Sequence, residues 1–186
     1  MKTRWYKKGV LLVVLFTNCL VFPQRNDHSM TWTESLKLTW DNFKDQPDPN
    51  SDVVAITASG LTFQYTIQKE NDEIIGFTTE VKTSFYPEKS WVKPESTNPH
   101  ILSHEQLHFD ITELHARKFK QQLSKLKVSK NLVEILDSIH YQIQADLKMM
   151  QNLYDTETDF SRNIKVQAHW EQHVQKELLK LSGFKS

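Results

Sequence analysis

The positions of proline and glycine divide this 186-residue chain into two parts. All six prolines lie at or before position 99, and Gly183 is the single glycine after it. Because these two residue types interrupt helices more than any others, residues 100–182 can form long, uninterrupted helices. The part before Pro99 holds the turn residues, and it also holds the segments in which apolar and polar residues alternate.

The two parts carry different hydrophobic periods. Three helices are expected in the second part, at residues 100–126, 131–154 and 164–181. Alternation in the first part predicts four strands, at residues 36–40, 53–58, 61–68 and 74–85. Strands followed by helices indicate an α+β fold, here a small N-terminal antiparallel β-sheet followed by about three α-helices.

The N-terminus has the composition of an export signal. Four basic residues precede an apolar run at residues 9–22, which is shorter than the roughly 20 residues of a membrane span. We therefore expect a secreted protein, or one of the periplasm or cell envelope. The expected divisions are a signal peptide at residues 1–23, a linker at 24–34 and a single domain at 35–186.

Charge and cysteine content exclude several classes of protein. The net charge of zero excludes a nucleic-acid binder driven by bulk positive charge. The single cysteine, Cys19, excludes a disulfide framework and a thiolate-rich zinc site. A membrane tether is expected only if the signal stays uncleaved or Cys19 is lipidated. Any metal must then be held by imidazoles, of which the chain has eight, and by carboxylates.

Residues 104–108 read His-Glu-Gln-Leu-His, which is the pattern H-E-x-x-H. Residues at positions i and i+4 project from the same face of a helix, so His104 and His108 can reach one ion. Glu105 can act as general base towards a zinc-activated water. The pattern therefore predicts a Zn2+-dependent metallopeptidase that hydrolyses peptide bonds in a peptide or protein substrate. The alternative is a non-catalytic envelope or binding module that retains the zincin-like fold.

In zinc peptidases with this motif, a sheet precedes the active-site helix and an edge strand takes up the substrate as an added strand. We expect residues 80–85 to form that edge.

The longer run at residues 101–117 resembles a bacterial domain-of-unknown-function family, number 922, which implies a secreted zinc-dependent protease. Further stretches that resemble this family lie at residues 38–44, 55–60, 90–93 and 154–158, with Gln167 and Trp170 after them. The resemblance covers most of residues 36–170. It also implies a histidine near Phe160, where this chain has Asp159-Phe160-Ser161.

A catalytic zinc normally has three protein ligands, and the motif supplies two. The turn expected between the second and third helices concentrates carboxylates at Asp155, Glu157 and Asp159. We expect Asp159 to be the third ligand, with Glu157 as the alternative. Helix capping is the competing role for these acids, with Asp155 or Thr158 ending one helix and Asp159 or Ser161 starting the next.

The other polar residues near the motif have expected roles away from the ion. His100 is too far from His108 along a straight helix to share one ion, and His115 points along the helix. Asp110 is the candidate for the second shell, where it would accept a hydrogen bond from a ligating imidazole. Two further pairs have i, i+4 spacing: Glu113 with Arg117 as a structural ion pair, and His169 with His173 as a solvated pair.

Overall fold

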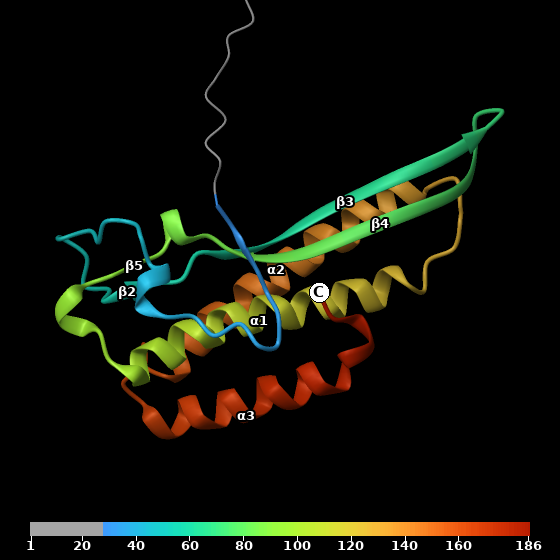
Figure 1. The fold of residues 1–186 in the computed structure, drawn as a ribbon. Helices are drawn as coiled ribbons and strands as arrows, with labels where there is room; N and C mark the ends of the chain where they lie inside the picture. The colour runs from blue at the N-terminus through green and yellow to red at the C-terminus, as the bar shows by residue number, and fades with distance from the viewer. Residues whose placement is uncertain (1–27) are drawn as a thin grey trace, which may run out of the picture.

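The computed structural model describes residues 28–186, so the predicted signal peptide and Cys19 lie outside the described residues. The described chain has an α+β fold in which strands precede three helices, as the sequence predicts (Figure 1). The strands are β1 (Met30–Thr31), β2 (Ala55–Ile56), β3 (Ser59–Glu70), β4 (Glu73–Phe85) and β5 (Trp91–Val92). The helices are α1 (Pro99–Leu123), α2 (Leu132–Glu157) and α3 (Ile164–Lys180). None of the helices in residues 28–186 combines the length and hydropathy that a bilayer span requires.

The larger sheet is a long hairpin with one short added strand. Strands β3 and β4 pair antiparallel along their whole lengths, and β1 pairs with the end of β4, giving the order β1-β4-β3. The hairpin turns at Asn71 and Asp72, whose φ angles are 49° and 65°. Asn and Asp tolerate this left-handed conformation better than other non-glycine residues, which explains the turn between the strands predicted at residues 61–68 and 74–85.

The segment before this hairpin differs from the prediction. Residues 24–34 are predicted as a linker, yet Met30 and Thr31 form β1, and Trp32 is buried. Residues 36–40 are predicted as a strand but form none. The backbone N–H of Leu38 donates instead to the side chain of Gln106 on α1, at 2.8 Å. An extended segment that packs one side against a helix shows the same alternation of apolar and polar residues as a strand in a sheet. The pattern alone therefore cannot distinguish such a segment from a strand.

A second, smaller sheet lies near the start of α1. Of the predicted strand at residues 53–58, only Ala55 and Ile56 form a strand, and β2 pairs antiparallel with β5. Figure 1 shows β2 between β5 and α1. The hydroxyl of Thr57 donates to the backbone carbonyl of Glu105 at 3.2 Å, which joins this sheet to the helix.

Helix α1 is the centre of the structure. It packs against β3, β4, α2 and α3, and it is buried on nearly all sides over residues 109–117. In Figure 1 it runs between the β3–β4 hairpin and α3. Asn98 begins the helix by accepting a hydrogen bond from the Ile101 N–H at 2.9 Å, and Pro99 occupies the first turn, where its missing N–H has no cost.

A buried ion pair connects α1 to its neighbours. As predicted, Glu113 pairs with Arg117, with Nε to Oε1 at 2.8 Å, and both side chains are essentially inaccessible to solvent. Thr83 of β4 donates to Glu113 at 2.8 Å, and Arg117 donates to the Leu178 carbonyl of α3 at 2.6 Å. The guanidinium also lies over the Trp32 ring, 5.0 Å from its centroid. These contacts compensate for the removal of both charges from water.

Replacing Arg117 by Met should lower the free energy of unfolding by about 3–5 kcal/mol, because Glu113 is left as a buried, unpaired carboxylate. Urea denaturation measures this loss. The matched control is Lys180→Met, which removes the exposed pair with Glu177 and should leave the stability nearly unchanged. Similar small losses in both variants would contradict the role of the buried pair.

Candidate metal centre

Three ligand atoms converge between α1 and α2. The Nε2 atoms of His104 and His108 lie 3.2 Å apart, and Oδ1 of Asp155 lies 3.2 Å from the first and 2.9 Å from the second. A tetrahedral zinc ion with bonds of about 2.0–2.1 Å separates its ligand atoms by roughly 3.3 Å. The three atoms therefore already have nearly the spacing that one zinc ion requires. No other group of histidines and acids within residues 28–186 meets the geometry of a metal site.

The electrostatics of the cluster favour a positive charge between these atoms. Burial would raise the pKa of Asp155, but hydrogen bonds and charge interactions with the two imidazoles hold it well below its usual range. Burial would lower the pKa of His108, but the Asp155 and Gln151 side chains and the Glu105 charge outweigh this effect and raise it. A carboxylate and two imidazole nitrogens in contact suit a bound cation, so the residues present fit a metal ion.

Gln151 sets the tautomer of His108. Its amide nitrogen donates to the His108 carbonyl at 2.9 Å and to the Thr112 hydroxyl at 3.3 Å, so its Oε1 faces the ring and accepts from Nδ1. With the proton on Nδ1, the Nε2 lone pair of His108 is free for a metal. Nδ1 of His104 is buried without a hydrogen-bond partner among the described residues.

Tyr154 packs against the His104 ring, the other imidazole of the cluster. Its ring stacks on His104 at 4.5 Å between centroids, and its hydroxyl donates to the His104 carbonyl at 3.5 Å. Tyr154 is fully buried, and burial raises the pKa of its hydroxyl. Tyr154 therefore belongs to the core that supports the cluster.

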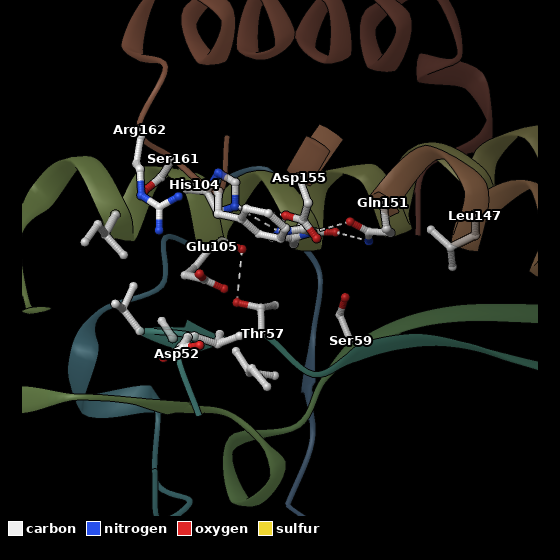
Figure 2. A pocket seen from close by; sticks show the side chains of 17 residues that line it. Asp52, Thr57, Ser59, His104, Glu105, Leu147, Gln151, Asp155, Ser161 and Arg162 are labelled. Atoms are coloured by element: carbon white, nitrogen blue, oxygen red, sulfur yellow. Dashed lines mark hydrogen bonds and ion pairs between the residues drawn. The ribbon is translucent and has the colours of Figure 1, made fainter. Parts of the chain in front are cut away.

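The cluster forms part of the wall of a cavity of about 710 Å³. Figure 2 shows Glu105 extending into this cavity beside His104. Glu105 is only 4% exposed, and its carboxylate has no hydrogen-bond or ion-pair partner within residues 28–186. A carboxylate without a fixed partner, next to a candidate metal centre, can exchange protons with a bound molecule.

The third member of the cluster differs from the prediction. Asp159 was expected there, yet its exposed carboxylate pairs with Arg162 at 3.2 Å. The alternative, Glu157, accepts a hydrogen bond from Trp170 at 2.8 Å. Helix α2 continues to Glu157, beyond its predicted end at residue 154, so Asp155 lies within the helix. Asp155 therefore shares a helix face with Gln151, and this i, i+4 spacing is the signal in the sequence that could have identified both.

The second-shell prediction for Asp110 is wrong. Asp110 accepts hydrogen bonds from Trp32 at 2.8 Å and from Gln106 at 3.0 Å, and neither imidazole of the cluster is among its partners in the described chain. Burial raises the pKa of this carboxyl. Its role is to attach the segment after β1 to helix α1.

The cavity is lined by a different strand from the one predicted. Residues 80–85 belong to β4, which pairs with β3 on one side and, at its end, with β1 on the other. Both residues of β2 line the cavity, together with Ser59 at the start of β3. The Lys93 N–H donates to the Val54 carbonyl at 2.8 Å, so the backbone groups of Val54 face β5. In an antiparallel pair, the backbone N–H and C=O groups of successive residues point to opposite sides of the strand. The backbone groups of Ala55 therefore face away from β5, along the edge of β2 that has no partner strand in the described sheet.

The remaining histidines lie away from the cluster. The His100 ring donates to the Ser161 carbonyl at 2.6 Å. His115 is buried, and its Nδ1 donates to the Ile111 carbonyl at 2.9 Å. His169 and His173 lie on the exposed surface of α3, as expected for a solvated pair.

Burial lowers the pKa of His115 from 6.5 to about 4 in the folded protein. Between about pH 6.5 and pH 4 the unfolded chain binds a proton at this residue that the folded chain does not, so stability falls as the pH falls through this range. Replacing His115 by Gln should remove that part of the pH dependence. Melting temperatures of the wild type and of His115→Gln, measured from pH 7 to pH 4, give the pH dependence of stability. If the two melting temperatures fell by the same amount over this range, the prediction would be contradicted.

No curated protein and no solved structure matches this chain. Residues 23–162 match the family model described as bacterial protein of unknown function, DUF922. The match covers the hairpin and helices α1 and α2, and thus the three residues of the candidate metal centre. Because it extends over well more than half of the 186 residues, the chain belongs to the DUF922 family.

Proposed function

We propose that this protein is a zinc-dependent metallopeptidase with a zincin-like site. His104, His108 and Asp155 would hold the ion, and Glu105 would be the general base. The single observation that carries the proposal is the convergence of Nε2, Nε2 and Oδ1 at 2.9–3.2 Å from one another, in the wall of a cavity that also contains Glu105.

The ligand set suits zinc in a catalytic role. Two neutral imidazoles and one carboxylate are a known set of protein ligands for catalytic zinc, and three ligands leave a fourth position open. Zinc, when bound, supplies Lewis-acid chemistry that activates water and polarises a carbonyl group. Asp155 contributes the one negative charge among the ligands, and Gln151 keeps the His108 lone pair directed at the ion.

Glu105 moves the proton in this proposal. It follows His104 directly on α1, and no side chain or backbone group of residues 28–186 holds its carboxylate. The carboxylate can take a proton from the attacking water and pass it to the leaving amine nitrogen. Because Glu105 is buried in the cavity wall, this proton transfer takes place away from bulk water.

The cavity suits an extended peptide. Its volume of about 710 Å³ lies within the range of small-molecule sites and accommodates several residues. The free backbone groups of Ala55 can pair with a peptide as an added strand, which holds a substrate by main-chain hydrogen bonds whatever its side chains. Thr57 keeps β2 next to Glu105, and therefore next to the reacting bond.

The proposal includes export to the periplasm, cell envelope or medium. Its support is the basic start and apolar run of the first 23 residues.

Zinc content tests the ligand set. The purified wild-type protein should carry about one zinc per chain by elemental analysis, and His104→Ala and Asp155→Asn should both lose it, because two ligands hold the ion poorly. The matched control is Asp159→Asn, four residues further on, which should keep the metal. A wild type with no more zinc than His104→Ala contradicts the metal site. If Asp159→Asn lost zinc while Asp155→Asn kept it, the assignment of Asp155 as the third ligand would be contradicted.

Peptide cleavage tests the role of Glu105. Glu105→Gln should retain zinc but cleave a peptide library on the order of 10²–10⁴ times more slowly than wild type, because the amide cannot accept the proton. Mass spectrometry of the digest measures the products. Equal cleavage by both proteins would discard this mechanism, and no cleavage by a zinc-loaded wild type would favour a non-catalytic binding module.

A further inference from the structure

We propose that Arg162 binds a carboxylate group of the substrate, so that the cavity selects peptides with a free C-terminus or an acidic side chain at one end. This inference rests on the proposed function and adds a substrate class to it. The observations that carry it are the position of Arg162, its weak pairing within the protein and the rigid turn that presents it.

Arg162 lines one end of the cavity. Figure 2 shows its side chain extending from the α2–α3 turn towards the side where Glu105 lies, and it shows Leu147 at the opposite end. The lining also contains the acids Asp52, Glu105 and Asp155 and the two imidazoles of the candidate metal centre. Apart from that centre, Arg162 is therefore the side chain in the lining that attracts a carboxylate.

The guanidinium is available for a ligand. Among residues 28–186 its one side-chain partner is Asp159, which Nη1 contacts at 3.2 Å while both side chains remain more than half exposed. Such an exposed pair is weak, and most of the guanidinium donors remain unused. The planar fork of an arginine matches the two oxygens of a carboxylate better than a lysine does.

The turn that presents Arg162 is unusual and well held. Asp159, Phe160 and Ser161 have φ angles of 48°, 50° and 72°, and none of them is glycine. Three consecutive left-handed residues are unfavourable for L-amino acids, and such strain is concentrated at functional sites.

Hydrogen bonds hold this conformation. The Phe160 N–H donates to the Asp155 carbonyl at 2.8 Å, and the His100 ring donates to the Ser161 carbonyl at 2.6 Å. The same segment therefore fixes Arg162 relative to both Asp155 and helix α1, where the candidate ligands lie.

The orientation of β2 indicates which end of a peptide meets Arg162. In Figure 2 Asp52 lies on the Arg162 side and Ser59 on the Leu147 side, so β2 runs away from Arg162. A peptide that pairs antiparallel with β2, the commoner arrangement, therefore directs its C-terminal part towards Arg162. A terminal carboxylate or an acidic side chain in that part supplies the same chemistry.

Binding of synthetic peptides tests the inference without requiring cleavage. Calorimetry with the zinc-loaded Glu105→Gln protein would use acetylated hexapeptide pools in two matched pairs. One pair has a free or an amidated C-terminus, and the other has Glu or Gln near an amidated C-terminus. We expect at least one carboxylate pool to bind about tenfold more tightly than its neutral partner, and the pair that shows the difference identifies the source of the carboxylate.

Adding Arg162→Gln should abolish that preference, and adding Arg162→Lys should restore only part of it. The matched control is Lys165→Gln, which removes an exposed positive charge three residues away that does not line the cavity. Absence of any preference, absence of peptide binding, or a preference that survives Arg162→Gln would overturn the inference.

Digestion of the same pools by the protein with Glu105 intact separates the two proposals. Cleavage with no carboxylate preference overturns the role of Arg162 and leaves the peptidase standing. Carboxylate-dependent binding with no cleavage supports Arg162 and contradicts the peptidase.

Discussion

Burial of helix α1 on nearly every side is the constraint on which the rest of the structure depends. Its apolar residues bring the β3–β4 hairpin, α2 and α3 together, and its polar residues need partners because they are removed from water. Asp110 accepts a hydrogen bond from Trp32, Glu113 accepts one from Thr83 of β4, and His108 contacts Gln151 of α2. Each of these contacts fixes another segment relative to the helix, so the candidate metal centre and the core are held by the same packing.

The candidate metal centre differs from these other buried polar groups. The buried carboxylates of Asp110 and Glu113 both have protein donors, which are Trp32 and Gln106 for Asp110 and Arg117 and Thr83 for Glu113. Two imidazole nitrogens and the Asp155 oxygen instead face one another, and the Glu105 carboxylate has no partner in the described chain. Such an arrangement is costly unless a cation or a bound molecule completes it, and this contrast within one helix distinguishes a site from a core.

The sequence was sufficient for features that depend on local spacing. The three helices, the hairpin turn at Asn71, the facing pair His104 and His108, and the Glu113–Arg117 pair all follow from residues a few positions apart. The sequence does not identify Asp155 as the third member of the cluster, because the periodicity ends the second helix at residue 154 and helix ends are the least certain part of such predictions. If the helix ends at residue 154, Asp155 is a capping residue; because α2 continues to Glu157, Asp155 instead lies on the same helix face as Gln151.

Features that depend on contacts distant in sequence could not be predicted. The strand lining the cavity is two residues long and was distinguished from residues 80–85 only by the pairing of the sheets. Asp110 satisfies the spacing of a second-shell residue, yet Trp32, 78 positions away, takes its hydrogen bond. Arg162 has no motif around it, and its place at the cavity follows from three left-handed residues that no local pattern indicated.

The central claim is that one metal ion binds where α1 meets the end of α2. Crystals grown with zinc and measured at the zinc absorption edge test it most directly. The account predicts one strong anomalous peak about 2 Å from His104 Nε2, His108 Nε2 and a carboxylate oxygen of Asp155. Absence of a peak there, with these three side chains still in mutual contact, would contradict it.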